Sequence, residues 1–366
     1  MTVEMPIIHI AAQLSEHNNR ASGSEPPNDA DGCSPSSGLE NIRENWRAQG
    51  FSEEAVNIMG ESRRKGTKSA YECAWRKWTS WCAEQQVDPF HTTLANVINF
   101  LSHSFQEGRE YATLNTYRSA ISAYHPRIEG WKVGQHPQIM EFMRGVFNRR
   151  PPIPKYTDTW NVDIVLQYIR QLGNSQDLSD KLLTLKTTML LGLTNAGRAQ
   201  EIQSLNPNLM QDYGNRLVFP IARLTKVKRP AKPTVSFELL QFDGDELLDV
   251  VQCVRIYLER TRNWRTTISR QEQLLLAIVR PHNPVAVSTV SRWLKELMGL
   301  AGIDTDKYKG HSVRSAATSK NMTLGLNISQ ILERANWSKA NTFYRFYYRD
   351  IVNTENSFQI RVLQSK

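Results

Sequence analysis

Residues 309–350 contain side chains whose types and spacing suit chemistry on a phosphate group. His311 and Arg314 are three positions apart, which places them about one turn apart on a helix. An arginine presents a planar fork that matches phosphate oxygens, a histidine can hold or transfer a proton near neutral pH, and a tyrosine can act as an oxygen nucleophile. The aromatic residues that follow this pair are Trp337, Tyr344, Tyr347 and Tyr348. The alternative is a structural role, because most histidines are structural and aromatic clusters near a C-terminus usually belong to a core.

A further arginine upstream can contribute to the same site. Residues 162–173 and 178–206 are predicted to form two helices, because apolar residues recur in them at helical spacing. Arg198 follows Asn-Ala-Gly near a helix start, where it can share an anion with backbone N–H groups. An ion pair with Glu201, three positions later, is the alternative interpretation of Arg198.

Residues 215–239 differ from their surroundings, because two runs of apolar and β-branched residues flank a basic turn. This pattern predicts a β-hairpin or a small sheet with Lys226 and Lys228 at its tip. A lysine on a hairpin can enter a groove and neutralise a phosphate or donate a proton, although exposed turn lysines are common. The other elements predicted after it are a helix at 245–264, a strand at 273–279 and a helix at 288–303.

The first half of the chain shows the pattern of a helical bundle. The apolar residues of its first clear helix recur at helical spacing and are Tyr71, Trp75, Trp78 and Cys82. Segments 94–105 and 113–125 are also of helix length, which predicts four or five helices ending near Arg150. Basic residues that can contact DNA phosphates from this bundle, or remain idle surface charges, are Arg63, Arg64, Lys65, Lys68, Arg76, Lys77, Arg118, Arg144, Arg149 and Arg150.

Charge is unevenly distributed along the 366 residues. Residues 1–45 hold seven acidic and two basic side chains, so the net charge of +9 leaves +14 on the remainder. A basic body predicts a polyanionic partner, most commonly nucleic acid, whereas solvated lysines without such a partner are the alternative. The predicted division is a flexible acidic tail at 1–45, a helical domain at 46–150, a Pro-rich linker at 151–158, a second domain at 159–350 and a C-terminal tail at 351–366.

Several classes of protein do not fit this composition. The four cysteines have neither the spacing of a zinc site nor the density of a disulfide framework, which predicts a reducing intracellular compartment. The best apolar run, 182–193, is too short to span a membrane and contains Lys186. No basic region precedes an apolar stretch at the N-terminus, so no signal peptide is expected. We expect neither a metal site nor a cofactor.

Taken in chain order, these motifs resemble the tyrosine recombinase (phage-integrase-like) superfamily. The likeness covers about residues 60–350 and is closest to the eukaryotic recombinases of DIRS-type and Ngaro-type retrotransposons and of Crypton elements, through HSVRSAATS, ILERANWS and TFYRFYYRD. The resemblance implies a mainly α fold. A helical core-binding (SAM-like) bundle would precede a mostly helical α+β catalytic domain with a small antiparallel sheet, and the two would form a C-shaped clamp around DNA.

The resemblance also assigns roles to the upstream residues. Arg198 in NAGRAQEI matches the first catalytic arginine of the family, and Glu201 matches the acidic residue three positions later. Lys226 in LTKVKRP falls where the family keeps its hairpin lysine, with Lys228 as the alternative.

The remaining catalytic positions lie in the C-terminal segment. His311 and Arg314 match the H-x-x-R pair of the family, and Trp337 stands where most members have a second histidine. The nucleophilic tyrosine often lies nine positions later, but that position is Phe346, so one residue must be inserted. Tyr347 is the predicted nucleophile, because YYRD resembles the tyrosine-plus-basic pattern that follows the cleavage position. The alternative nucleophiles are Tyr344 and Tyr348.

The resemblance implies a site-specific recombinase or transposase of a mobile element, which cleaves and rejoins DNA through a 3′-phosphotyrosine intermediate without metal or ATP. The expected partner is double-stranded DNA, with a tetramer in synapsis and a monomer or dimer without DNA, in the nucleus. The tail at 351–366 is expected to dock on a neighbouring copy. The alternatives are a type IB topoisomerase and a domesticated fold retained for DNA binding or protein interaction.

Overall fold

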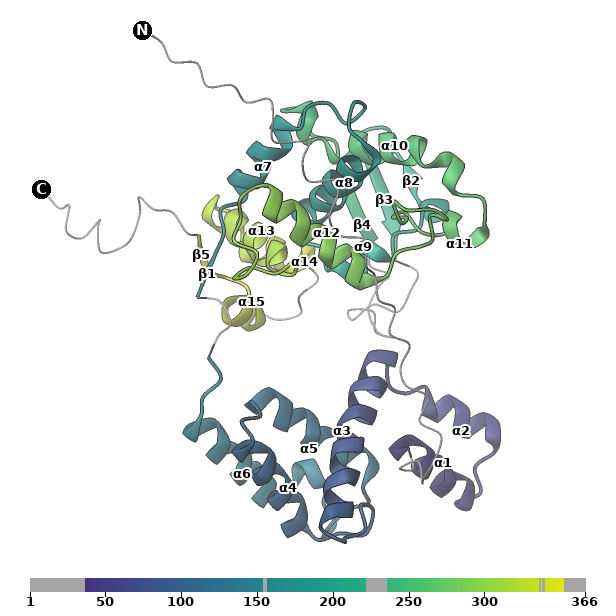
Figure 1. Cartoon of the computed structure of the whole chain (residues 1–366), viewed down its shortest axis with the longest axis vertical. Helices are drawn as coiled ribbons and strands as arrows, with labels where there is room; N and C mark the ends of the chain where they lie inside the picture. Colours follow the sequence, from purple (N-terminus) through teal and green to yellow (C-terminus); the bar gives the residue numbers. More distant parts are fainter. Residues whose placement is uncertain (1–36, 154–156, 222–235, 336, 338–339, 352–366) are drawn as a thin grey trace, which may run out of the picture. The chain divides into compact units, whose positions relative to one another are not determined.

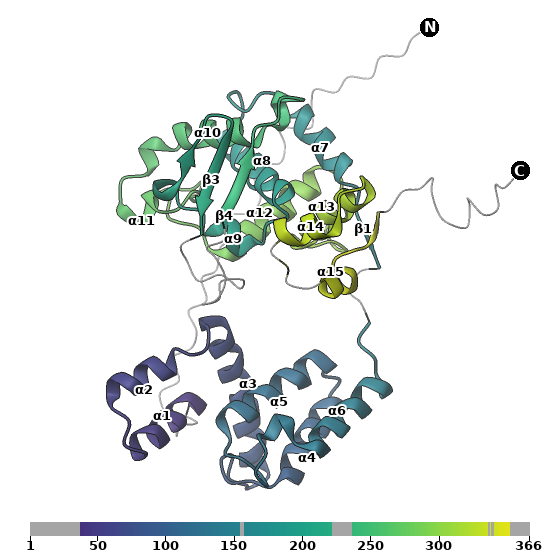
Figure 2. The same ribbon diagram turned by 180° about the vertical axis from the view of Figure 1, so that it is seen from behind.

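The chain divides into two compact units between Ile153 and Pro154, inside the segment predicted as a linker. Both units are mainly helical, and a small antiparallel sheet lies in the second (Figures 1 and 2). The predicted fold class, mainly α with a sheet in the second domain, is therefore confirmed. The computed structural model describes residues 37–153, 157–221, 236–335, 337 and 340–351.

The first unit is a helical bundle in which α3 (Lys65–Glu84) and α5 (Tyr111–Tyr124) pack against each other. Trp75, Trp78 and Cys82 are fully buried on one face of α3, which confirms the helix predicted from their spacing. The other helices of this unit are α1 (Gly38–Ala48), α2 (Glu53–Gly60), α4 (Leu94–Gln106), α6 (Pro137–Arg149) and the 3-10 helix η1 (Val133–Gln135).

The first helix begins before the predicted end of the acidic tail. Because α1 starts at Gly38, residues 38–45 are helical and the predicted boundary at residue 45 is wrong. The carboxylate of Glu72 in α3 accepts a hydrogen bond from the backbone N–H of Leu39 at 3.1 Å, and N–H groups in a first helical turn need such outside acceptors. A Cβ atom on Gly38 would lie 2.4 Å from the ring of Tyr124. The composition of residues 38–45 did not predict this helix, because the contacts that support it come from other helices.

The second unit is built around α8 (Asp180–Thr194), which is buried along almost its whole length. Every residue from Leu183 to Leu193 is buried, which explains why most of the residues there are apolar and the three threonines bond the helix's own carbonyls or lie in the core. Lys186 is buried with them and donates a hydrogen bond from Nζ to the Gly173 carbonyl at 3.1 Å, and burial lowers its pKa. The best apolar run is thus a core helix, and none of the described helices is long and apolar enough to cross a membrane.

The segment 178–206, predicted as one helix, is broken into α8 and the short α9 (Ala199–Gln203). Ala196 ends the first helix with a φ of +44°, a left-handed value that is uncommon for a residue other than glycine. The remaining helices of this unit are α7 (Val162–Gln171), α10 (Val250–Arg260), α11 (Ile268–Gln271), α12 (Val287–Leu300), α13 (Ser312–Thr323), α14 (Ile328–Arg334) and α15 (Ala340–Phe346), with the 3-10 helices η2 (Pro207–Leu209), η3 (Glu246–Leu248) and η4 (Arg262–Trp264).

The antiparallel sheet has the order β2-β3-β4. Strand β3 (Arg216–Pro220) pairs with β4 (Ser236–Leu240), and β2 (Gln211–Asp212) lies on the outer side of β3. Alternate residues of β3 and β4 are buried, which confirms the predicted hairpin strands. The connection between these strands, with Lys226 and Lys228, lies outside the described residues.

A second, parallel strand pair joins the start of this unit to its C-terminal part. In it β1 (Asp158–Thr159) pairs with β5 (Asp350–Ile351). Figure 1 shows the pair beside α13 and α15, the helices of the segment that carries the predicted histidine, arginine and tyrosine.

The prediction of a strand at 273–279 is wrong. Leu274, Leu275 and Leu276 are fully buried, but the segment makes only an isolated bridge, from Leu276 to Pro284. The guanidinium of Arg265 donates to the carbonyls of Gln273 and Leu274, both at 2.7 Å, where a neighbouring strand would otherwise donate. The apolar run is a core loop, and periodicity alone cannot distinguish this from a short buried strand.

Candidate active site

Arg314 is placed by the way α13 begins. His311 is the N-cap residue of α13 and has an exposed side chain, whereas Arg314 lies in the first turn and is only 4% exposed. Gly310 comes just before and approaches α12 closely, since a Cβ atom there would lie 2.4 Å from the Ser291 carbonyl oxygen. The H-x-x-R spacing thus puts one side chain in solvent and the other in the interior of the unit.

Two backbone carbonyls hold the guanidinium of Arg314. Its Nη1 donates to the Ala196 carbonyl at 2.5 Å, and its Nη2 donates to the Ala335 carbonyl that follows α14. Its Nε is buried and has no hydrogen-bond partner among the described residues. A buried arginine with two of its five N–H donors on fixed backbone atoms, and with Nε among those left over, is suited to receive an anion.

The acidic residue Glu201 lies between the two arginines. Its Oε1 accepts a hydrogen bond from Arg198 Nη1 at 2.6 Å, and its Oε2 accepts one from the Arg198 backbone N–H at 2.8 Å and lies 3.7 Å from Arg314 Nη1. Glu201 is 4% exposed, and Arg198 is the N-cap of α9. The predicted ion pair between Arg198 and Glu201 is therefore present, within a cluster that also includes Arg314.

The electrostatics of this cluster favour a further negative charge. Two guanidiniums and one carboxylate leave a net positive charge in a poorly hydrated place. Burial and the neighbouring charge of Arg198 lower the pKa of Arg314 to about 10, although Glu201 opposes them. The guanidinium of Arg314 stays charged at neutral pH, and Glu201 alone cannot balance the positive charges of both arginines. A bound anion would add the missing negative charge.

Of the three candidate tyrosines, Tyr347 is the one shown in contact with this cluster. Its ring centroid lies 4.4 Å from that of Trp337 and 5.6 Å from the Cζ atom of Arg314. Trp337 is buried and lies 4.4 Å from the same Cζ atom, so its ring contacts both the cation and the phenol.

The two other tyrosines lie elsewhere on the C-terminal segment. Tyr344 and Tyr348 are 45% and 38% exposed, and their rings meet edge to face at 6.0 Å. Each also packs on the buried ring of Phe343, at 5.2 and 5.7 Å. The structure thus brings Arg198, Glu201, Arg314, Trp337 and Tyr347 together, whereas Tyr344 and Tyr348 form a separate aromatic cluster.

Sequence reasoning missed the carbonyl of Ala196 as part of this site. The left-handed φ of Ala196 turns the chain between α8 and α9, at a cost of about 1–3 kcal/mol, and its carbonyl binds Arg314. Gly197 allows the turn to lie against β4, because a Cβ atom there would come within 3.0 Å of the Phe237 ring. A non-glycine residue with strained backbone gives no local sequence signal, so only the fold reveals this acceptor.

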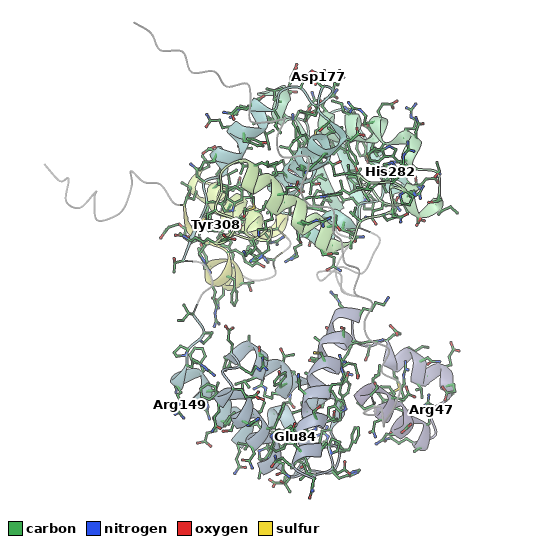
Figure 3. All side chains as sticks on the ribbon, viewed as in Figure 1. Arg47, Glu84, Arg149, Asp177, His282 and Tyr308 are labelled. Carbon is green, nitrogen blue, oxygen red and sulfur yellow. The ribbon has the colours of Figure 1, made fainter. Side chains whose placement is uncertain are left out.

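The basic residues predicted to bind DNA fall into two groups. Some are engaged within the first unit, as shown by Lys68 in an ion pair with Glu61 at 2.6 Å and by Arg150, whose Nη2 donates to the Phe105 carbonyl at 2.9 Å. The others in this group are Arg63, on aromatic rings, and Arg118, on the Met140 sulfur. The second group, whose members are also exposed, comprises Arg64, Lys65, Arg76 and Lys77 on or next to α3, and Arg144 and Arg149 on α6 (Arg149 is labelled in Figure 3).

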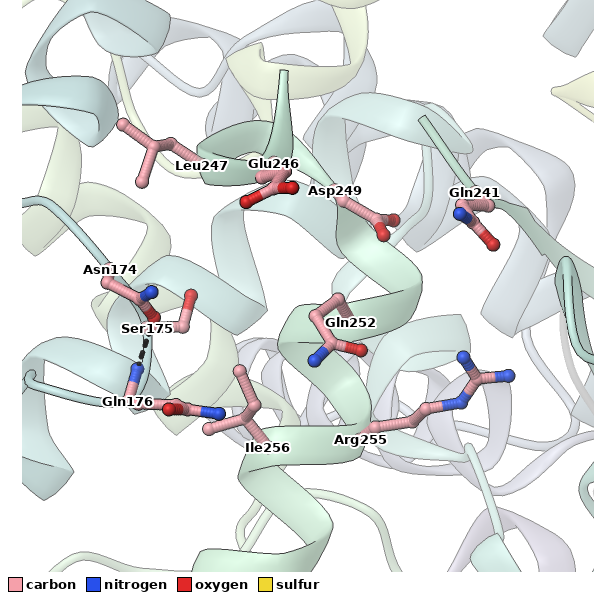
Figure 4. A pocket seen from close by; sticks show the side chains of 10 residues that line it. All are labelled: Asn174, Ser175, Gln176, Gln241, Glu246, Leu247, Asp249, Gln252, Arg255 and Ile256. Carbon is pink, nitrogen blue, oxygen red and sulfur yellow. Dashed lines mark hydrogen bonds between the residues drawn. The ribbon is translucent and has the colours of Figure 1, made fainter. Parts of the chain in front are cut away.

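A polar pocket in the second unit is distinct from this cluster. It lies beside α10 and the turn after α7, and none of its lining residues belongs to the arginine cluster (Figure 4). Two of its charged groups are already used, since Arg255 pairs with Asp212 at 2.6 Å and Asp249 caps α10 through the Val251 N–H at 2.9 Å. Within the described residues, no group of histidine, cysteine and acidic side chains is arranged to hold a metal ion.

Comparison with solved structures relates the whole arrangement to known folds. The XerH site-specific recombinase bound to difH substrate, in a pre-cleavage complex, has a TM-score of 0.55 at 12% identity, over 90% of this chain and 94% of that chain. Its post-cleavage complex with palindromic difH has a TM-score of 0.52 at 12% identity, over 83% of each chain. The Tn1549 transposon integrase (Y379F) in complex with transposon right end DNA has a TM-score of 0.52 at 13% identity, over 90% of this chain and 98% of that chain.

At these identities the likeness establishes a shared fold, which is that of site-specific recombinases and integrases. No protein-family model and no curated protein sequence matches the chain.

Proposed function

We propose that the chain is a site-specific DNA recombinase that cleaves and rejoins strands through a 3′-phosphotyrosine intermediate. The observation that carries the proposal is the contact of Tyr347 with Trp337 and Arg314, in a cluster where two arginines meet one carboxylate. A phenol beside paired guanidiniums is suited to attack on a phosphodiester. The shared fold with structures of DNA-bound recombinases supports the same assignment.

The proposed reaction is a transesterification. The Tyr347 oxygen gives up its phenolic proton to an acceptor, for which His311 is proposed, and attacks phosphorus. The bond to the 5′ oxygen breaks, and the 3′ phosphate becomes linked to the tyrosine. The leaving oxygen takes up a proton and departs as a 5′ hydroxyl, and the 5′ hydroxyl of a second strand can reverse the step. Because the ester bond is exchanged rather than hydrolysed, the reaction consumes neither ATP nor an oxidant, and the proposal requires no metal ion.

Each residue of the cluster has a proposed role in this reaction. Arg198 and Arg314 bind the nonbridging oxygens and stabilise the charge of the pentavalent transition state. Glu201 holds Arg198, since it binds both the guanidinium and the backbone N–H of that residue. Trp337 supplies its indole N–H as a further donor to the phosphate.

Two groups are proposed to handle protons. His311, at the start of α13, acts as a hydrogen-bond partner or proton acceptor one turn from Arg314. Lys226, or Lys228, acts as the general acid for the 5′ oxygen, a role that rests on the resemblance because both residues lie outside the described part of the chain.

The proposal extends to partner and cellular setting. The partner is duplex DNA, and exchange takes place in a homotetramer, in which the resemblance implies a docking role for residues 351–366. The resemblance of HSVRSAATS and TFYRFYYRD to DIRS, Ngaro and Crypton recombinases supports a mobile element as the source and the nucleus as the place of action.

Covalent trapping tests the central step. A nicked duplex that loses a short 5′-hydroxyl fragment after cleavage is expected to leave the wild-type protein attached to the 3′ phosphate, because religation is no longer possible. A slower band on a denaturing gel, with the modified peptide mapped by mass spectrometry to Tyr347, is the expected result. Absence of an adduct on a library of such ends contradicts the proposal. Relaxation of a supercoiled plasmid without exchange between two sites indicates a topoisomerase instead.

The exposed arginines of α6 give a separate prediction about DNA binding. Arg144→Gln with Arg149→Gln is expected to weaken duplex binding and to reduce the slope of log affinity against log salt by about 0.9 for each phosphate that the protein no longer neutralises. Fluorescence anisotropy at several salt concentrations measures this slope. Arg47→Gln is the matched control, because Arg47 is engaged by Glu40 and Glu53 within the first unit. An unchanged slope in the double variant removes α6 from the DNA-binding surface.

A further inference from the structure

Two serines of α13 bind the backbone of Tyr347. Ser315 Oγ donates a hydrogen bond to the Tyr347 carbonyl at 2.5 Å, and Ser319 Oγ donates to the same carbonyl at 3.3 Å. Ser319 Oγ also accepts a hydrogen bond from the Arg349 N–H at 3.1 Å. The serines are four positions apart, so they lie on the same face of α13 and act on the same short piece of chain.

The hydroxyls of Ser315 and Ser319 donate to the Tyr347 carbonyl, which has no donor within α15. Helix α15 ends at Phe346, so Tyr347 follows its last residue and the Tyr347 carbonyl is not followed by a helical turn that could donate to it. The N–H groups of Tyr347 and Tyr348 both point back to the Phe343 carbonyl, at 2.8 and 2.9 Å. The backbone of the tyrosine is therefore tied to α15 through its N–H and to α13 through its C=O.

A strand pair holds the chain just after the tyrosine. Strand β5 begins at Asp350 and pairs with Asp158 and Thr159 of β1. The Asp158 carboxylate accepts hydrogen bonds from Tyr308 Oη at 2.6 Å (Tyr308 is labelled in Figure 3) and from Lys307 Nζ at 2.7 Å. Both donors lie just ahead of α13, so the same region of the fold supports the chain on either side of the serine contacts.

We propose that Ser315 and Ser319 are positioning residues that hold Tyr347 at the attacking distance from the phosphate. This inference rests on the proposed function. Helix α13 carries Arg314, which would bind the phosphate, immediately before Ser315, which binds the backbone of the nucleophile. One rigid element therefore sets the distance between the two reacting partners. The serines act on the reaction through the placement of Tyr347 and have no direct contact with the phosphate.

Single-turnover kinetics with saturating nicked duplex tests this role. Ser315→Ala with Ser319→Ala is expected to lower the rate of covalent adduct formation by about 10²-fold, because a misplacement of about 1 Å costs this much. DNA affinity is expected to stay at the wild-type value, since neither serine is part of the arginine cluster. Ser315→Thr restores a hydroxyl at the half-buried position and is expected to retain most of the rate.

Two controls make the result decisive. Thr323→Ala removes a hydroxyl of the same helix that, among the described residues, binds the helix backbone through the Ser319 carbonyl at 3.0 Å, and the variant is expected to cleave at the wild-type rate. Thermal unfolding identifies a variant that fails to fold, and the single variant Ser315→Ala then replaces the double one. A folded variant with wild-type rate overturns the positioning role alone, whereas a wild-type protein that forms no adduct overturns the proposed function.

Discussion

Tyr347→Phe is expected to bind duplex DNA with wild-type affinity and to form no covalent adduct with the nicked substrate. The substitution removes one oxygen and keeps the ring that packs against Trp337 at 4.4 Å and lies 5.6 Å from the Arg314 guanidinium. The fold and the anion site should therefore survive, while the atom proposed to attack phosphorus is removed. Denaturing gels after incubation with the nicked duplex, together with anisotropy for binding, measure both properties on the same preparation.

The neighbouring tyrosines provide the matched controls for this substitution. Tyr344→Phe and Tyr348→Phe make the same chemical change within four positions, on side chains that pack with Phe343. Both variants are expected to form the adduct as the wild-type protein does. A covalent adduct with Tyr347→Phe, or its loss in one of the two controls, would show that the nucleophile is assigned to the wrong residue.

Arg314→Ala is expected to lower the single-turnover rate of cleavage by roughly 10²–10³ or more, which is typical for loss of one donor to a developing negative charge. The guanidinium is held by the carbonyls of Ala196 and Ala335, so it needs little reorganisation when charge appears on the phosphate. Arg314→Lys should recover little of the rate, because an ammonium group lacks the planar fork that binds both carbonyls and an anion together.

Arg265, which is half-buried, offers a control for the structural cost of removing an arginine bound to backbone carbonyls. Like Arg314, it donates to backbone carbonyls, those of Gln273 and Leu274, and burial lowers its pKa. Arg265→Ala is expected to lower the thermal stability and to leave the cleavage rate of the folded protein unchanged. If Arg314→Ala and Arg265→Ala have the same effect on rate, the effect of Arg314 is structural and its phosphate-binding role is wrong.

Periodicity in the sequence was sufficient to predict the helices and strands that have one strongly apolar side. The spacing of Trp75, Trp78 and Cys82 predicted α3, because helical geometry alone puts these side chains on one face. Two runs of apolar and β-branched residues around a basic turn predicted the hairpin strands, because such residues favour strands. Periodicity did not reveal α1, the break at Ala196 or the absence of a strand at 273–279, because contacts from distant segments determine all of them.

The sequence by itself determined which residue types are available for phosphate chemistry. It also determined that His311 and Arg314 are separated by about one helical turn. It left three tyrosines open, because the ninth position after Trp337 is Phe346 and Tyr344, Tyr347 and Tyr348 all lie close to it. Only the tertiary structure shows which of the three tyrosine rings lies against the buried guanidinium of Arg314. The reason is that α13, through Ser315 and Ser319, fixes the rotation of the chain at Tyr347, and no spacing within the segment encodes that contact.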